Sequence, residues 1–190
     1  ILGYDVNSPE RAQLKTALKD LAANKIQIPC IINGKEIFTG KTVPVVMPHS
    51  HGEVLADLHL AGPKEIQMAI DGAMKAKEEW ATTGWEKRLG IFEKMADMLA
   101  GEWRMKINGA TMLGQSKNAF QAEMDAGGEF VDFFRLNAAF YRDILRRQPI
   151  SAPGMQNTMD YRPLDGFVAA ITPFNFTAIA ANIPGAPVMG

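Results

Sequence analysis

The residues of this sequence whose types and spacing could do chemistry fall in three places. The first holds His49 and His51, two residues apart, with His59 further along the chain. Two histidines at this spacing on a strand point the same way and could bind a metal ion. No cysteine lies near them, however, and the pair falls in a turn rich in Pro, Ser and Gly. We therefore favour a solvated turn, and the sequence predicts no metal site.

The second place is Cys30, the single cysteine of the chain. A cysteine could act as a nucleophile, but this one follows Pro29 in an apolar run and has no histidine close to it in sequence. Because free cysteines are among the most buried residue types, we expect Cys30 to have a structural role. One cysteine also excludes an internal disulfide framework and a Cys-rich zinc site.

The third place is the segment 166–177, in which small and β-branched residues lead into Thr-Pro-Phe-Asn-Phe. Pro173 should end a strand here because proline cannot donate to the ladder. Asn175 would then lie at the carboxyl end of the strand, where open α/β sheets bind ligands. Its NH₂ group, held between two Phe rings, could donate to a developing oxyanion. It could equally cap the following helix, and spacing alone leaves both interpretations open.

The elements that would position these residues begin with a helix and several short strands. Ser8 and Pro9 are typical of an N-cap and a first helical residue. The pair Asn33-Gly34 lies between two apolar runs, which predicts a β-hairpin over 28–38. Further strands are expected at 43–47 and 54–60.

Long helices should occupy the middle of the chain, from Pro63 to Arg146, and cover a sheet. Apolar residues spaced by three and four predict one amphipathic helix between Leu89 and Trp103, and another over about 118–146. Because glycine disfavours a helix interior, Gly127-Gly128 indicates close packing against another backbone or a local kink. Strand patterns return at 155–161 and 167–172, the last ending near Pro173. The predicted fold class is α/β.

Composition limits the classes of function. The chain has 190 residues, of which 47% are hydrophobic, as in an ordinary soluble globular protein. Its 20 basic and 21 acidic residues give a net charge of −1, which argues against a binder of nucleic acid or of membrane surfaces. The most apolar stretch, 166–190, is interrupted by Pro and Asn and should not span a membrane. Its apolar ending leads us to expect a fragment.

The motif Ile171-Thr-Pro-Phe-Asn-Phe176 resembles the Pro-Trp/Phe-Asn-Phe motif of the aldehyde dehydrogenase superfamily. The longer stretch 161–179 is similar to the branch of that superfamily that oxidises glutamate γ-semialdehyde. Further segments resemble the same branch, at 8–11, 17–20, 28–30, 112–115, 121–126, 132–135 and 148–150. The resemblance covers essentially the whole chain.

The resemblance implies the N-terminal part of the aldehyde dehydrogenase fold, in which helices and strands lead into a Rossmann-like NAD-binding sheet. Residues 1–147 would form the N-terminal part of the NAD-binding domain, and 148–165 an oligomerisation hairpin. Residues 166–190 would begin the dinucleotide-binding sheet, so that the chain is truncated. A homo-oligomer is expected, with the remainder of the same enzyme chain as a further partner.

The activity implied is NAD-dependent oxidation of L-glutamate γ-semialdehyde to L-glutamate in proline catabolism, by a longer enzyme. Members of the family oxidise an aldehyde through a cysteine thiohemiacetal, hydride transfer to nicotinamide, and thioester hydrolysis assisted by a glutamate. Both catalytic residues lie downstream of the matching stretch, and Cys30 does not match the nucleophile. The 190 residues alone should therefore be inactive. Another aldehyde dehydrogenase, or a non-catalytic assembly or binding fragment, is the alternative. The enzyme would be cytoplasmic in a bacterium and otherwise in the mitochondrial matrix.

The resemblance also assigns roles to individual residues. Asn175 matches the asparagine that stabilises the oxyanion, and Phe176 matches an aromatic wall of the aldehyde pocket. The segment that lines the nicotinamide-ribose end of the cofactor cleft corresponds to Ile171, Thr172, Pro173 and Phe174. Glu129 matches a glutamate near the aldehyde site, although Gly127-Gly128 before it departs from the small non-glycine residues of the family. A solvated helix carboxylate is the alternative for Glu129.

Overall fold

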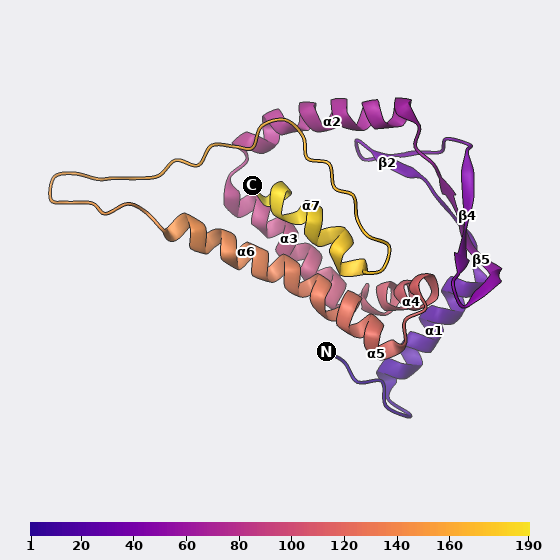
Figure 1. The fold of residues 1–190 in the computed structure, drawn as a ribbon. Helices are drawn as coiled ribbons and strands as arrows, with labels where there is room; N and C mark the ends of the chain where they lie inside the picture. The colour runs from indigo at the N-terminus through magenta and orange to yellow at the C-terminus, as the bar shows by residue number, and fades with distance from the viewer.

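The computed structural model describes all 190 residues, with the strands gathered at one end and helices over most of the rest (Figure 1). Helix α1 (Pro9–Ala23) begins the ordered elements. Oγ of Ser8 accepts a hydrogen bond from the backbone N–H of Arg11 at 3.1 Å, which satisfies one of the free donors of the first turn. The predicted helix start is therefore confirmed.

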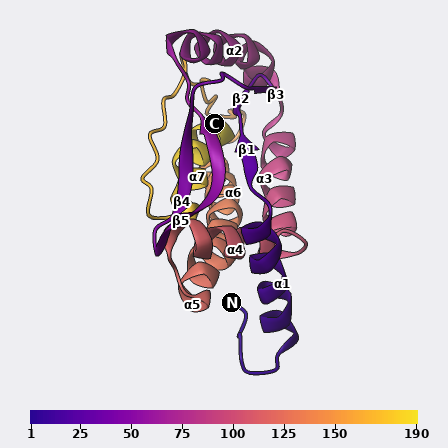
Figure 2. The same ribbon diagram turned by 90° about the vertical axis from the view of Figure 1, so that its right-hand side faces the viewer.

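Two small sheets follow α1 (Figure 2). In the first, β5 (Ser50–His59) lies between β1 (Ile26–Ile28), which is parallel to it, and β4 (Thr42–Met47), which is antiparallel. The second is the predicted hairpin, formed by β2 (Cys30–Ile32) and β3 (Lys35–Ile37). Its turn residues Asn33 and Gly34 both have positive φ, as a two-residue hairpin turn of this kind requires.

The helices pack mainly on one another, which differs from the expectation that they cover a sheet. The packed group consists of α3 (Trp85–Ala100), α6 (Phe130–Arg146) and α7 (Thr177–Met189), with α2 (Pro63–Thr82) along one side (Figure 1). Their shared core is formed by Leu89, Phe92, Ala96, Val131, Phe134, Ala138 and Met189. The predicted stripe of α3 is thus confirmed, except that α3 ends before Gly101 and leaves Trp103 outside it.

The expected long helix over 118–146 is divided by a π-helix. A short helix α5 (Ala119–Ala122) leads into the π-helix η1 (Glu123–Glu129), which continues into α6. A Cβ atom added to Gly127 would lie 2.7 Å from Oε2 of Glu123, and one added to Gly128 would lie 2.6 Å from Cδ1 of Ile1. The tight contacts at the two glycines are with side chains, so the predicted packing against another backbone is wrong, and the pair lies instead within the π-helix that interrupts the regular helix. No helix of the structure is both long enough and apolar enough to cross a membrane.

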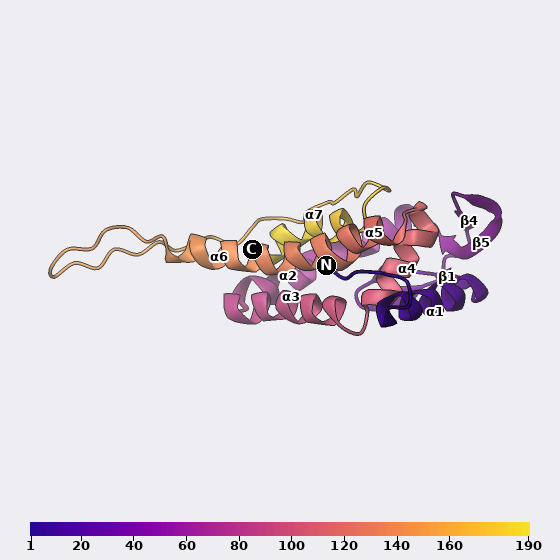
Figure 3. The ribbon, with the colours of Figure 1, turned by 90° about the horizontal axis from the view of Figure 1, so that it is seen from below.

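The segment between α6 and α7 forms no strand, so the strands predicted at 155–161 and 167–172 are wrong for this chain. It runs out as an arm beyond the end of α6 and returns past α3 to α7 (Figures 1 and 3). A single bridge joins Ala152 to Met155 near its tip. None of β1 to β5 pairs with it. Its backbone is extended but unpaired, because a strand needs a neighbouring strand to complete its hydrogen bonds.

Candidate functional site

Asn175 lies directly before α7, at the end of the returning segment. Its side chain is exposed, and the only hydrogen bond that the residue makes is accepted by its backbone oxygen from Nζ of Lys117, at 2.8 Å. The amide of Asn175 is therefore without a partner within the chain. That leaves its NH₂ group able to donate to a bound molecule.

Asp125, on η1, caps α7 in place of Asn175. Its two carboxylate oxygens accept hydrogen bonds from the backbone N–H groups of Thr177 and Ala178, at 2.9 and 2.8 Å. A carboxylate at this position satisfies two free donors and interacts favourably with the helix dipole. The side chain of Asp125 is 2% exposed, so this contact is shielded from water. The interpretation of Asn175 as a helix cap is therefore wrong.

The end of α4 (Arg104–Gln115) holds the same segment from another side. Oγ1 of Thr177 lies 2.7 Å from Oγ1 of Thr111 and accepts a hydrogen bond from Nε2 of Gln115 at 2.9 Å. Lys117 follows shortly after Gln115, and its Nζ is 2.6 Å from Oδ2 of Asp125. The start of α7 is thus fixed by side chains from α4, η1 and the turn between them.

The segment predicted to bind the cofactor, Ile171 to Phe174, is open to solvent. Ile171 is 92% exposed and Phe174 is 93% exposed. The expectation that two Phe rings enclose the Asn175 amide is wrong for this chain, because Phe174 projects into solvent. Phe176 is less exposed and lies against Lys117, whose Nζ is 4.1 Å from the centre of its ring.

Glu129 is the last residue of η1 and is exposed. Its carboxylate forms no ion pair or hydrogen bond within the chain, whereas Asp125 on the same π-helix is fully engaged. The structure brings the Asp125 carboxylate, and not that of Glu129, into contact with the residues around Asn175. The proposed contact of Glu129 with the aldehyde stays a prediction.

The three histidines do not converge, and no group of three or more His, Cys, Asp or Glu side chains could hold a metal ion. Nδ1 of His49 is 2.9 Å from Oγ of Ser116, while His51 is exposed on β5, which begins earlier than expected. His59 is buried, and its Nδ1 accepts a hydrogen bond from the backbone N–H of Gly40 at 3.1 Å. Sγ of Cys30 donates to the backbone oxygen of His59 at 3.4 Å, in keeping with a structural role.

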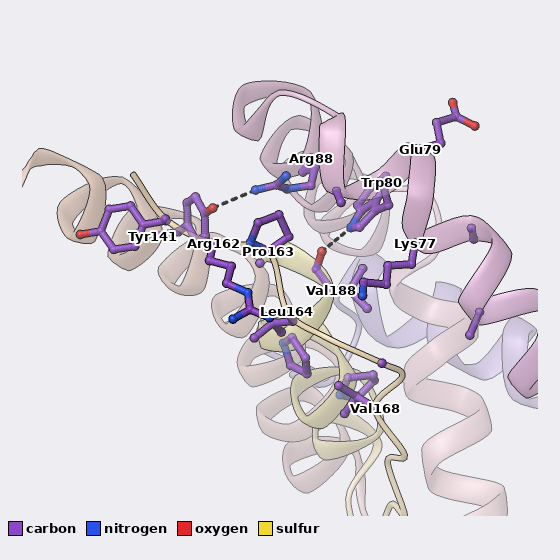
Figure 4. A pocket seen from close by; sticks show the side chains of 18 of the residues that line it. Lys77, Glu79, Trp80, Arg88, Tyr141, Arg162, Pro163, Leu164, Val168 and Val188 are labelled. Atoms are coloured by element: carbon purple, nitrogen blue, oxygen red, sulfur yellow. Dashed lines mark hydrogen bonds between the residues drawn. The ribbon is translucent and has the colours of Figure 1, made fainter. Parts of the chain in front are cut away.

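A cavity lies away from all of these residues, between α2, the returning segment and the end of α7 (Figure 4). It has a volume of about 610 Å³. Two of its polar groups bind the chain itself: Nε1 of Trp80 donates to the backbone oxygen of Val188 at 2.7 Å, and Nη2 of Arg88 donates to the hydroxyl of Tyr141 at 2.8 Å. None of the predicted site residues lines it.

Sequence reasoning missed Lys117, Asp125 and the neighbouring Glu123. Within 122–128 the sequence places two acidic residues among alanines and glycines in the middle of a helix. Acidic residues are almost never fully buried unless they are paired. That pattern, in a helix otherwise expected to face the core, was the available signal for buried ionic contacts.

The sequence profile described as the aldehyde dehydrogenase family matches residues 37–189. The chain belongs to that family. Among curated relatives, a Δ1-pyrroline-5-carboxylate dehydrogenase from Agaricus bisporus is 44% identical over 191 residues, which cover 100% of this chain and 35% of the relative. The human mitochondrial enzyme of the same name is 43% identical over 189 residues, covering 100% of this chain and 34% of its own. This chain therefore spans about a third of their length.

A solved structure gives the same result for the fold. The Δ1-pyrroline-5-carboxylate dehydrogenase from Mycobacterium tuberculosis, in a crystal structure bound with NAD, is 49% identical with a TM-score of 0.96. The match covers 100% of this chain and 36% of that chain. The resemblance inferred from 171–176 is thus confirmed, as is the α/β fold of the N-terminal part of an aldehyde dehydrogenase.

Proposed function

We propose that this chain is the N-terminal part of an NAD-dependent enzyme that oxidises L-glutamate γ-semialdehyde, formed from Δ1-pyrroline-5-carboxylate, to L-glutamate. The observation that carries the proposal is the unpartnered amide of Asn175, which is left free because Asp125 caps α7. The substrate is supported by relatives that carry the name of this activity. The place of the reaction is proline catabolism.

Asn175 would act as a hydrogen-bond donor to the oxyanion formed when a nucleophile attacks the aldehyde. Such a donor accelerates the reaction because it stabilises charge that is present only along the reaction path. It must lie about 2.7–3.1 Å from the position of the oxyanion, so its backbone has to be held firmly. The nucleophilic cysteine and the general-base glutamate are expected elsewhere in the longer chain, so residues 1–190 alone should not turn over substrate.

The segment from Ile171 to Phe174 would hold the nicotinamide-ribose end of NAD, which serves as the hydride acceptor. The exposed surface of this segment suits such a group. Its backbone N–H and C=O groups make no backbone hydrogen bonds and can bind ribose hydroxyls. The side chains of Ile171 and Phe174 offer apolar surface to a flat ring. The NAD in the mycobacterial structure also supports this cofactor.

Phe176 and Glu129 would contribute to the aldehyde site. Phe176 is fixed against Lys117 and can present its other face as a wall of the pocket. Glu129 is a free carboxylate on η1, which packs against α7. A carboxylate with no partner in the chain can attract the ammonium group of an amino-acid aldehyde.

The arm over 148–165 would be an oligomerisation hairpin, with 1–147 as the N-terminal part of the NAD-binding domain and 166–190 as the start of its sheet. The chain doubles back at the tip of the arm, where Ala152 bridges to Met155. The arm exposes several large apolar side chains, among them Ile150, Met155, Met159 and Leu164. Apolar residues exposed on a projecting segment are typical of an interface, here between copies of the enzyme. The proposed location is the cytoplasm of a bacterium or the mitochondrial matrix of a eukaryote.

The test is the substitution Asn175→Ala in the complete enzyme. Loss of one oxyanion donor typically lowers kcat by about 10²–10³-fold, and kcat/KM should fall with it. The melting temperature should not change, because the Asn175 side chain makes no hydrogen bond in the fold. Asn24→Ala, which removes an exposed asparagine at the end of α1, is the control. Full activity of Asn175→Ala would disprove this role, and a wild-type enzyme that oxidises only other aldehydes would disprove the substrate.

A further inference from the structure

One ammonium group, Nζ of Lys117, reaches two successive residues of the candidate site. It donates to the backbone oxygen of Asn175 at 2.8 Å and lies 4.1 Å from the ring centre of Phe176. Its counter-ion is Asp125, at 2.6 Å. The side chains of Lys117 and Asp125 are 16% and 2% exposed, so their ion pair is largely shielded from competing water. An ordinary surface lysine makes no such set of contacts.

Asn175 lies at the boundary between an unpaired segment and a fixed helix. Before it, the backbone from Arg162 to Phe174 makes no backbone hydrogen bonds. After it, the N–H groups of Thr177 and Ala178 are bound by Asp125. The bond from Lys117 is the only polar contact that restrains the Asn175 residue itself. Its loss would therefore loosen the residue that carries the candidate donor.

The charge of Lys117 cannot itself stabilise an oxyanion strongly, because Asp125 neutralises it at close range. Its effect on the site is therefore geometric. Asp125 also joins the two halves of the arrangement, since the same Oδ2 atom accepts from Nζ of Lys117 and from the N–H of Thr177. Lysine, aspartate and the start of α7 thus form one connected unit around Asn175.

We propose that Lys117, held by Asp125, is a positioning residue that sets the orientation of the Asn175 amide. This inference rests on the function proposed above. Misplacing a reacting group by about 1 Å can cost on the order of 100-fold in rate. We call the bond from Lys117 to the backbone of Asn175 the clamp. Its loss should reduce catalysis through Asn175, without a direct contact between Lys117 and the substrate.

The experiment is a double-mutant cycle in the complete enzyme, with Lys117→Met, Asn175→Ala and the two together. Lys117→Met should lower kcat by about 10- to 100-fold while leaving the KM for NAD within about twofold. In the Asn175→Ala background the same substitution should change kcat by less than about threefold, because the amide that it orients is already gone. Lys117→Arg, which keeps the charge and a donor, should recover most of the lost rate.

Lys25→Met is the matched control, because Lys25 also forms an ion pair, with Asp57 at 2.9 Å, but on the strand β1. Its kcat should equal that of the wild type. A wild-type kcat in Lys117→Met would overturn the positioning role. So would a double variant whose loss in kcat equals the product of the two single losses, because the two residues would then act independently. If Lys117→Met yields no folded enzyme, Lys117→Gln enters the same cycle under the same criteria.

The two proposals fail in different ways. If kcat falls strongly in Asn175→Ala but not in Lys117→Met, only the positioning role of Lys117 is disproved. If kcat does not fall in Asn175→Ala, both the oxyanion role and the positioning role are disproved, because there is then no catalytic amide to position.

Discussion

Glu123 is a fully buried carboxylate that accepts hydrogen bonds from several parts of the chain. Its donors are the backbone N–H of Leu2 at 2.6 Å, the hydroxyl of Tyr4 at 2.7 Å, Nδ2 of Asn108 at 2.7 Å, and the guanidinium of Arg104. Burial alone would raise the pKa of Glu123, but these hydrogen bonds, led by that from Arg104, lower it. Burial, together with the bond to Glu123, also raises the pKa of Tyr4 to about 12.

The substitution Glu123→Leu replaces the carboxylate by an apolar side chain of similar size and so removes the shared acceptor. It leaves the charge of Arg104 without its counter-ion, beside Asn108, whose Oδ1 already has no hydrogen-bond partner. Breaking one side of a buried ion pair costs about 3–5 kcal/mol, because the other charge stays buried. Glu93→Leu is the matched control: Glu93 pairs with Arg142 at 2.7 Å but is 42% exposed. Its loss should cost less than about 1 kcal/mol.

The measurement is urea unfolding followed by tryptophan fluorescence, for which Trp103, next to Arg104, serves as a probe. In both variants the free energy of unfolding should fall with urea at the wild-type slope, so that the shift in midpoint reports the change in that free energy. The buried network would be refuted as a source of stability if Glu123→Leu lost no more free energy of unfolding than Glu93→Leu.

The lowered pKa of Glu123 also fixes the sign of a pH dependence. An unfolded glutamate has a pKa of about 4.3, so the fold favours the ionised form. The resulting stability is complete above that pH and is lost as the pH falls through the folded pKa. The wild type should therefore lose stability on acidification more steeply than Glu123→Leu. Parallel curves for the two proteins below about pH 4.3 would contradict this.

Three further outcomes are expected. Gly127→Ala should lower the free energy of unfolding by about 1–3 kcal/mol in the same urea assay, since its Cβ would lie 2.7 Å from Oε2 of Glu123. The control Gly114→Ala, whose Cβ would have nothing within 4 Å, should raise it by about 0.5–1 kcal/mol. Calorimetric titration of the 190-residue chain with NAD should show affinity weaker than micromolar, because its proposed contacts reach only the nicotinamide-ribose end of the cofactor; micromolar binding would contradict this. The complete enzyme should sediment as a homo-oligomer, and Ile150→Asp on the arm should weaken it; a wild-type monomer at micromolar concentration would count against the interface.

The elements that were predicted correctly are those specified by neighbouring residues. Ser8 caps α1 through a residue three positions away, and Asn33-Gly34 defines its hairpin by its own positive φ angles. The stripe from Leu89 to Leu99 requires only a helical period. Signals of this kind can be detected in a short window of sequence.

The predictions that were wrong depend on partners far away in the sequence. The run 167–172 has the composition of a strand, but a strand forms only where another lies beside it. The cap of α7 comes from Asp125, which is distant in sequence, so the local pattern could not decide between a cap and a ligand donor at Asn175. Lys117 and Glu123 were missed for the same reason, because their partners are known only from the fold.

Asn175 is therefore held by the chain on one side only, and its other side is open to water. Residues of 111–125 bind its backbone and the first turn of α7, and these are the contacts proposed to orient the amide. On the other side, Phe174 and Ile171 are open to water. Because a donor is strongest where water is excluded, the amide gains its full effect only when other groups cover these side chains. A bound cofactor, the substrate or further parts of the enzyme would supply that cover, so orientation and water exclusion have separate structural origins at this site.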